Sequence, residues 1–387
     1  MPRCRIHTDT MMEGMRQTEG GIQFSTSDAL GLAQAHDAFQ ALLEAQGLAR
    51  HVETAAMAGA GRHVIRFHLN EETASAWAPD GDTLRLTEML GLDSQTHAGD
   101  LEKEILVAML LAPVAFAFPS YDELIAALRM RRYIVEAACK TELDFHTTEA
   151  ERPADCWAYV EDRGFTVLPG TPLVTALRKA TQPAVSGARY SFSCYRATEY
   201  VILLGIAQEL AASNPGLLAR LQRQWECEPI MSARFHDVFL REYGAMEAPL
   251  PMKYYVPGDR LWFRNPDEAS ADVVGYEGSW VFYLGGGLFT NFWKWGEPFT
   301  LAAKCVEIYH WRHGTYRDST GELRMDESRV EAHVRASQAD PVALGRIVER
   351  MQRYRDPRGV YRDGGCIDTT REHPRWVCPG TADIRLP

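Results

Sequence analysis

Apolar residues recur at helical spacing in four segments of the chain. Positions three and four apart are apolar and the others are polar, which is the pattern of a helix with one buried face. Ser27-Asp28, Ser120 and Asp340 stand where N-caps are expected. The pattern predicts helices over residues 28–43, 101–113, 120–138 and from 341 onward.

One further segment, Tyr195–Ala212, is apolar on nearly every face. A helix that is apolar all round is a buried helix. Asn214-Pro215-Gly216 ends it, and Cys194 stands directly before its first residue. The sequence therefore predicts a central helix with a cysteine at its start.

Alternating patterns and turn residues predict several short strands. Residues 63–69 alternate, residues 157–168 form a strand pair around Arg163-Gly164, and the segments 252–255 and 259–263 are joined by Pro257-Gly258. Residues 278–295 are an aromatic hairpin folded at three glycines, 285–287. Residues 1–26 look like a polar lead-in, and the chain is loop-like from Arg355 on. Together with the helix before it, the strand at residues 63–69 indicates a small α+β extension.

Composition and charge exclude several classes of function. A chain of 387 residues that is 46% hydrophobic can bury a sizeable core, but its net charge of -11 repels nucleic acid. No segment has the roughly 18 apolar residues of a membrane span, and Met1–Arg5 leads into polar residues instead of the apolar core of a signal peptide. We expect a cytoplasmic protein, with export as an effector left open.

Eight cysteines are scattered along the chain, and none forms a Cys-x-x-Cys pair. Free thiols of this kind fit a reducing compartment. Cys366 and Cys378, with His373 between them, could be taken for a metal site, but a full ligand set is missing. We therefore expect neither a metal nor a cofactor.

Cys194 is the leading candidate for chemistry. The free N–H groups and the dipole at a helix start favour a thiolate, and the same N–H groups can hold an oxyanion. Arg196 adds positive charge nearby. The alternative interpretation is a structural cysteine at a helix end.

A cysteine nucleophile needs a partner that moves a proton. Glu277 leads into the aromatic hairpin, and His236, His310 and His313 are the other candidates. Each has an ordinary interpretation too, because Glu277 can be a solvated turn acid and the histidines can be packed residues near helix ends.

Five strings in order resemble the spore-coat type of bacterial transglutaminase, the small, calcium-independent protein-glutamine gamma-glutamyltransferases. Together they cover about residues 96–315. The strings lie within residues 111–130, 134–138, 192–198, 258–266 and 276–285.

The resemblance implies a compact, cysteine-protease-like (papain-like) α+β core, with the nucleophile at a helix start facing a small antiparallel sheet. It places Cys194 at the nucleophile and Glu277 at the catalytic glutamate, with a short insertion, Tyr195-Arg196, after the cysteine. Two positions depart from the family: Ser193 replaces a glutamate, and Asn291 replaces a histidine on the far strand of the hairpin. We expect Asn291 to orient a partner or donate a hydrogen bond.

The same comparison divides the chain into three parts. Residues 1–95 are an α+β extension, residues 96–318 the transglutaminase-like catalytic domain, and residues 319–387 a C-terminal helix with a loop-rich tail.

The implied reaction cross-links protein substrates. The thiolate of Cys194 attacks a glutamine side chain, ammonia leaves with a proton from Glu277, and a lysine amine resolves the thioester. For this work the pKa of Glu277 must rise, which we expect apolar surroundings to cause. Aromatic residues of the hairpin are expected to keep water out. They are Phe282, Tyr283, Phe289, Phe292, Trp293 and Trp295.

Two alternatives stay open at this point. In a glutamine deamidase, water resolves the same thioester. In a non-catalytic binding module, the fold remains without the chemistry, as the changes at Ser193 and Asn291 would allow.

Overall fold

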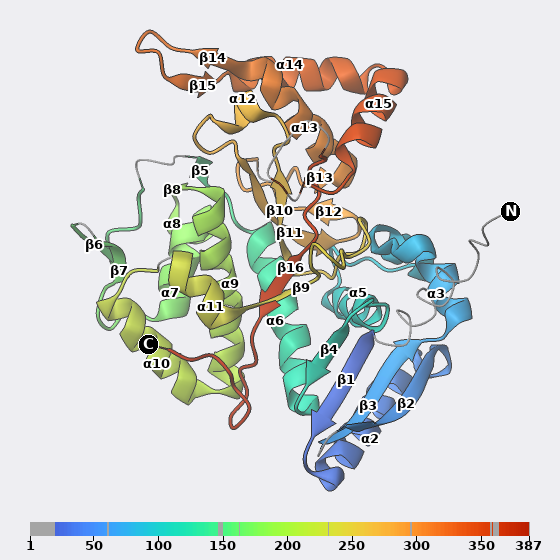
Figure 1. Cartoon of the computed structure of the whole chain (residues 1–387). Coiled ribbons are helices and arrows are strands. Elements are labelled where there is room, and N and C mark those ends of the chain that lie inside the picture. Colours follow the sequence, from blue (N-terminus) through green and yellow to red (C-terminus); the bar gives the residue numbers. More distant parts are fainter. Residues whose placement is uncertain are drawn as a thin grey trace, which may run out of the picture.

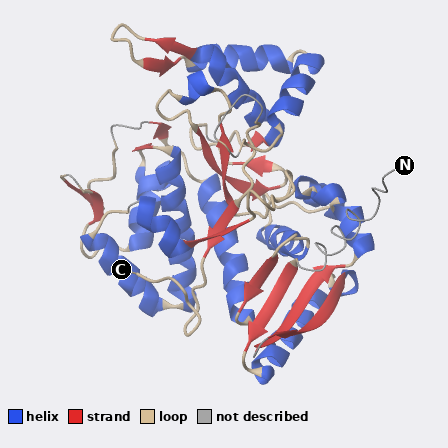
Figure 2. Cartoon of the chain, viewed as in Figure 1, coloured by secondary structure: helices blue, strands red, loops and turns tan. Residues whose placement is uncertain are grey.

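The computed structural model describes residues 20–59, 62–145, 150–161, 163–230, 232–294, 296–356, 358 and 364–386. Helices and strands are mixed along the whole of this chain (Figure 2), which confirms the α+β prediction. Figure 1 shows a blue sheet near the N-terminus, a second sheet in the middle of the molecule, and helices around both.

The first sheet has four strands in the order β2-β3-β1-β4. Strand β1 pairs antiparallel with β3 and parallel with β4. Ile22, Phe24 and Phe67 are buried and pack on Phe39 of the adjoining helix. The strands are β1 (Gly21–Thr26), β2 (Val52–Gly59), β3 (Arg62–Leu69) and β4 (Ala115–Phe118). The expected lead-in over residues 1–26 is therefore wrong from Gly21 on, because Ile22 and Phe24 alternate over too short a run to stand out.

The four helices with one apolar face are all present. Asp28 caps the first by accepting from two backbone N–H groups, and Ser120 caps the third by accepting from the N–H of Glu123. The four are α2 (Ala29–Ala45), α5 (Ala98–Leu110), α6 (Tyr121–Cys139) and α15 (Pro341–Met351). Each begins within three residues of its predicted start.

The central helix α9 (Cys194–Ser213) is buried from Ala197 to Ala207 and packs along α6. Gly205 makes this close packing possible, since a Cβ there would lie 2.6 Å from Ile134 Cγ1. No helix in the described residues is long and apolar enough to cross a membrane.

Six antiparallel strands form the second sheet, in the order β13-β12-β11-β10-β16-β9. Its members are β9 (Leu240–Tyr243), β10 (Arg260–Arg264), β11 (Gly278–Gly285), β12 (Leu288–Phe289), β13 (Phe299–Thr300) and β16 (Arg371–Pro374). The predicted hairpin is β11–β12, and its three glycines, 285–287, all have positive φ angles between 59° and 87°. Only glycine adopts such a run without strain.

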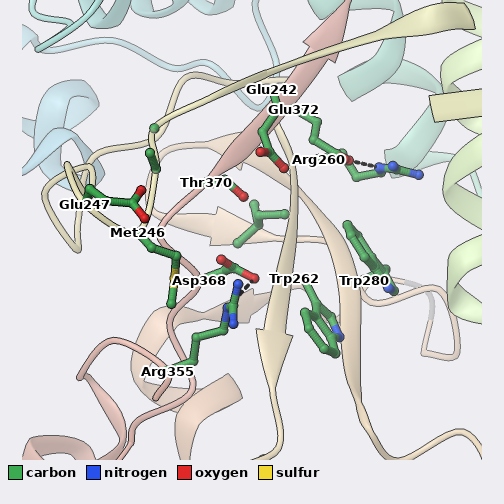
Figure 3. Close-up of a pocket in the computed structure, with 13 residues that line it drawn as sticks. Glu242, Met246, Glu247, Arg260, Trp262, Trp280, Arg355, Asp368, Thr370 and Glu372 are labelled. Atoms are coloured by element: carbon green, nitrogen blue, oxygen red, sulfur yellow. Dashed lines mark hydrogen bonds and ion pairs between the residues drawn. The ribbon is translucent and has the colours of Figure 1, made fainter. Parts of the chain in front are cut away.

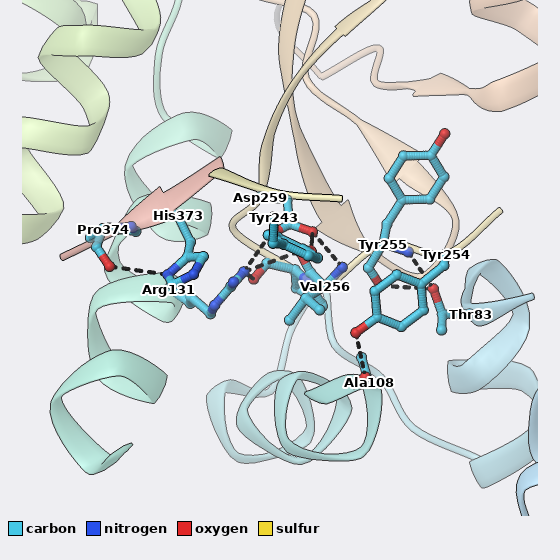
Figure 4. Close-up of polar contacts among 11 residues, drawn as sticks. Thr83, Ala108, Arg131, Tyr243, Tyr254, Tyr255, Val256, Asp259, His373 and Pro374 are labelled. Atoms are coloured by element: carbon cyan, nitrogen blue, oxygen red, sulfur yellow. Dashed lines mark hydrogen bonds and ion pairs between the residues drawn. The ribbon is translucent and has the colours of Figure 1, made fainter. Parts of the chain in front are cut away.

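Residues 252–255 do not form the predicted strand. Tyr254 and Tyr255 are buried, but each is held by contacts with distant segments, as Figure 4 shows: the Tyr254 hydroxyl donates to Ala108 O, and the Tyr255 N–H donates to Thr83 Oγ1. Beside them, Arg131 of α6 donates to Asp259 Oδ1 at 2.8 Å, an ion pair with both side chains buried. This pair fastens α6 to the loop before β10.

The tail after Arg355 contains strand β16, which the sequence analysis predicted as loop. Figure 1 shows it in red, crossing the centre of the molecule. It lies between β10 and β9, and Glu372 is opposite Arg260. Its residues are Arg-Glu-His-Pro, so the strand has no apolar alternation that could reveal it.

Candidate active site

Cys194 is the first residue of α9 and is half-buried. Ser193 is the N-cap, and its hydroxyl accepts from the N–H of Arg196 at 3.3 Å. Backbone groups of Tyr195 and Trp280 form hydrogen bonds to the thiol. Since Trp280 belongs to β11, the sulfur faces the antiparallel sheet, as expected for a helix-start nucleophile.

Burial raises the pKa of Cys194, and the charge of Glu277 raises it further. The backbone hydrogen bonds and the charge of Lys304 lower it, but the net pKa is above the usual value. The expectation that the helix start makes Cys194 a thiolate near neutral pH is therefore wrong. The N–H groups act as predicted, but the loss of solvent around the sulfur is the larger effect. Cys194 rests as a thiol and needs a base.

Glu277 directly precedes β11, and its charge acts on Cys194. Its carboxylate accepts from the N–H of Gly275 at 3.3 Å, and its backbone carbonyl accepts from the N–H of Asn265. The side chain is exposed, so the apolar enclosure expected for it is not present. The fold thus brings Glu277 to the cysteine but leaves its carboxylate in contact with water.

Asn291 lies just after β12, in a turn. Its amide donates to Glu297 O at 3.0 Å, and its side-chain oxygen accepts from the N–H of Trp293 at 3.4 Å. These contacts close the turn over residues 291–297. Among the interactions of the described residues, none joins Asn291 to Cys194.

The other predicted residues have separate partners. His236 contacts Glu372 Oε1 at 2.7 Å, and His310 lies against His313. Arg196 pairs with Glu199 and donates to Ile230 O, away from the sheet. Cys194, and not Arg196, is thus the residue that faces β11.

The predicted aromatic walls are in fact the core side of the sheet. Phe282, Tyr283, Phe289 and Phe292 are at most 2% exposed, and Trp295 lies outside the described residues. The aromatic pair beside the cysteine is Trp262 and Trp280, whose rings stack with centroids 5.8 Å apart and planes 10° apart.

A pocket of about 440 Å³ opens beside this tryptophan pair. Figure 3 shows Met246 and Glu247 on one side of it and the two tryptophans on the other. Trp280 therefore links the pocket to Cys194, because its backbone meets the sulfur and its ring lines the pocket. The lining residues are Glu242, Gly244, Ala245, Met246, Glu247, Arg260, Leu261, Trp262, Trp280, Arg355, Asp368, Thr370 and Glu372.

A family model described as protein-glutamine gamma-glutamyltransferase matches residues 84–383. This chain belongs to that family. The solved structures it is similar to include a transglutaminase from Geobacillus stearothermophilus without its C-terminal extension. The two are 18% identical, the comparison covers 56% of this chain and 98% of the other, and the TM-score is 0.37. A comparison with curated proteins gives no match.

This transglutaminase has site features that the sequence analysis missed. Lys304, only 3% exposed, lies in the first turn of α13 (Leu301–Gly314), and its charge reaches Cys194. Its ammonium is 2.9 Å from Glu307 Oε2 and 3.8 Å from the centre of the Phe299 ring. The sequence does contain a signal for Lys304, because a lysine within an apolar helical run is unusual.

The tail also supplies part of the site of this transglutaminase. Asp368, Thr370 and Glu372 line the pocket, and Glu372 bridges Arg260 and His236. The backbone N–H of Cys378 donates to Glu123 Oε1, whereas the sulfur of Cys366 lies 3.4 Å from the sulfur of Cys305. The two tail cysteines thus have different neighbours.

Proposed function

We propose that this transglutaminase cross-links glutamine and lysine side chains of protein substrates through a thioester on Cys194. The observation that carries the proposal is the position of Cys194 at the start of α9, with backbone hydrogen bonds from Tyr195 and Trp280 and with the charge of Glu277 acting on it. Nucleophile, proton acceptor and N–H donors meet there, which is the set that acyl transfer needs.

In the first half-reaction Glu277 removes the proton from the Cys194 thiol, after the bound substrate has covered its exposed carboxylate and supplied the apolar surroundings that this transfer needs. The thiolate attacks the γ-carboxamide carbon, and the oxygen that becomes negative accepts from backbone N–H groups at the helix start. The C–N bond then breaks, and ammonia leaves with the proton from Glu277. Because the resting group is a thiol, this proton transfer precedes every turnover.

In the second half-reaction a lysine amine attacks the thioester. Glu277 takes a proton from the attacking nitrogen, the C–S bond breaks, and Glu277 returns that proton to the sulfur, so Cys194 is a thiol again when the isopeptide bond has formed. Side chains move every proton in this scheme, so the proposed reaction needs no calcium.

We assign the pocket beside Trp280 to the acceptor lysine. Four carboxylates and two guanidinium groups line it, and the carboxylates of Glu242 and Glu247 are exposed. An acidic pocket attracts an ammonium group, and the stacked Trp262 and Trp280, over whose rings Arg264 and Arg260 already lie, form an apolar wall beside it. The lysine stem would then lie along the aromatic wall.

The seven cysteines that the structure describes are all free. Free thiols on this scale support a reducing compartment, so we propose that the enzyme acts in the cytoplasm.

The deciding experiment incubates the purified chain with a glutamine-containing protein and a labelled primary amine. We expect amine incorporation that is abolished in Cys194→Ala and kept in Cys227→Ala, since Cys227 is an exposed cysteine at the end of another helix. Release of ammonia without incorporation would indicate a deamidase. Neither product would indicate a binding module, and full activity of Cys194→Ala would exclude the thioester.

A further inference from the structure

Three histidines meet between the last two turns of α13 and helix α14 (Glu327–Gln338). His310 and His313 are three residues apart and lie on one face of α13, and His333 comes from α14. One ring nitrogen of each lies within 4.8 Å of the others. His310 Nδ1 is 2.9 Å from His313 Nδ1, and the rings of His313 and His333 are 4.5 Å apart.

Ordinary packing explains this cluster poorly. Two Nδ1 atoms at 2.9 Å are in hydrogen-bond contact only if one ring is protonated there and the other is not. Among the hydrogen bonds of the described residues none involves the His333 ring, which only stacks on the other two. None of the three histidines is among the charged groups that act on Cys194, so the cluster has no evident part in the proposed reaction.

We propose that His310, His313 and His333 bind one divalent transition-metal ion of the zinc class. Imidazole nitrogens suit zinc, cobalt, nickel and copper, whereas calcium and magnesium require oxygen ligands. Zinc–nitrogen bonds of about 2.0–2.1 Å place tetrahedral ligands about 3.3 Å apart. The 2.9 Å pair is near that spacing. The widest separation between ligand nitrogens is up to 4.8 Å. Rotation of the half-buried His333 side chain would shorten it to the spacing of tetrahedral ligands.

The surroundings of His310 fit a metal ligand. With Nδ1 on the metal, its Nε2–H donates to Ser337 Oγ, which is 2.8 Å away. Such an outer hydrogen bond fixes the tautomer and the ring orientation of a ligand histidine.

Charged groups near the cluster act in both directions. Arg312 and Arg329 act on His313 and oppose a cation, and Asp267 acts in the opposite sense. Asp267 also lies 4.0 Å from Arg312. Three neutral nitrogen ligands must therefore supply the affinity, as they do in zinc sites built from three histidines.

A metal here would join α14 to α13, and α14 contacts the segments that precede β11 and follow β12. Tyr276, next to Glu277, donates its hydroxyl to Glu327 Oε1 at 2.7 Å, and Lys294 pairs with Glu331. With three protein ligands the ion would keep a water in its fourth position while it joins the two helices, and the site stands independently of the proposed reaction.

Titration calorimetry of the chelator-treated full chain with Zn²⁺ tests the site. We expect one Zn²⁺ per chain, bound at least about 100-fold more weakly by His333→Gln, because losing a ligand must cost at least as much as losing an outer partner. Ser337→Ala should weaken binding about 10- to 100-fold for the same reason. His63→Gln, at an exposed histidine of β3, is the control and should bind like the wild type.

The absorption spectrum of the chain with bound cobalt(II) is a second test, and it needs no variant. A spectrum without sulfur-to-cobalt charge transfer is expected, because the ligands are nitrogens. Absence of stoichiometric binding, equal affinity in folded His333→Gln, or a sulfur-ligated cobalt spectrum would each overturn the proposal.

Discussion

At Cys194, burial and hydrogen bonding act on the same thiol in opposite directions. The backbone donors favour the thiolate, but loss of solvent favours the thiol and is the larger effect. For the proposed nucleophile, this balance implies a need for a base and slow modification of the sulfur at neutral pH.

Alkylation of Cys194 should therefore be slow at pH 7 and should speed up as the pH rises above the usual thiol value. Only the thiolate reacts, and a raised pKa moves its formation to higher pH. The exposed Cys227 serves as the internal reference. Mass spectrometry of iodoacetamide-treated protein measures both rates. Faster labelling at Cys194 than at Cys227 at pH 7 would contradict the raised pKa.

Glu277→Gln should lower the rate of amine incorporation by about 100- to 10,000-fold, the usual contribution of general acid–base catalysis. The resemblance implies that Ser193 replaces a second glutamate of the family, so we expect no neighbouring carboxylate to take over. Thermal stability should stay unchanged, because Glu277 is exposed and glutamine is nearly isosteric. Asp272→Asn, at an exposed acid of the same loop, is the matched control. If the Glu277→Gln enzyme keeps most of its rate, another residue must be the base.

The roles of individual residues were predictable only where the residue lies in a stretch of sequence that resembles the family. Cys194 and Glu277 stand in such strings, and the fold brings them together. Asn291 was assigned to the site only because of its position in the hairpin, and its side-chain hydrogen bond stays within its own turn. Lys304 and Glu372 reach the site from segments about 110 and 180 residues beyond Cys194, and no local pattern announces such contacts.

The β11–β12 hairpin depends on a buried carboxyl group in α5. Glu104 Oε1 accepts from the N–H of Gly286 at 3.0 Å and from the hydroxyl of Tyr283 at 3.2 Å. Glu104 is fully buried, and burial raises its pKa above the usual value of 4.5.

Glu104→Gln should reduce the loss of stability that the wild type shows on going from acid to neutral pH. A raised pKa in the folded state gives stability that is complete below the usual pKa and is lost as the pH rises through the folded value. Glutamine stays neutral, and its oxygen can still accept both bonds. Urea unfolding from pH 4 to 8 measures the difference, with the exposed Glu44→Gln as control. Parallel pH profiles for wild type and Glu104→Gln would be inconsistent with this role.

Asp259→Asn should destabilise the fold by about 3–5 kcal/mol, because it leaves Arg131 buried without its counter-charge. Asp259 also accepts from the N–H of Val256 at 2.8 Å and from the Tyr243 hydroxyl. Glu142→Gln, in an ion pair with Arg189 at the surface, should cost within about 1 kcal/mol. Chemical denaturation measures both. A similar cost for the two variants would show that the buried pair has no special weight.

Elements with strong local signals were predicted well. Caps at Asp28, Ser120 and Asp340 set three helix starts, and the glycines 285–287 set the hairpin turn. The strands β1 and β16 were missed because each is short and is held by pairing with distant strands, which no local pattern records.

The family match runs over residues 84–383 and so includes most of the C-terminal segment. Two helices of this segment, α14 and α15, pack on α13, and β16 completes the central sheet. The division at residues 95 and 318 stays a prediction.

A chain shortened to end at Asp318, or at Tyr354, should lose cooperative unfolding. Both lack β16, whose Arg371 and Glu372 are buried between β10 and β9. Near-ultraviolet circular dichroism with urea titration measures the loss. The full chain with a polar tag after Pro387 is the control for a changed terminus. A shortened chain with a native-like transition would show that the tail is dispensable.

The position of β16 also sets the order in which this enzyme can become active. Synthesis proceeds from the N-terminus at about 5–20 residues per second, so the β10 and β11 strands leave the ribosome well before the strand that lies beside β10. Asp368, Thr370 and Glu372 of the pocket are made more than 80 residues after the end of β11 at Gly285. A nascent chain therefore has Cys194 and Glu277 before it has the strand that lines the proposed amine pocket, and we expect cross-linking only after β16 has paired with β10.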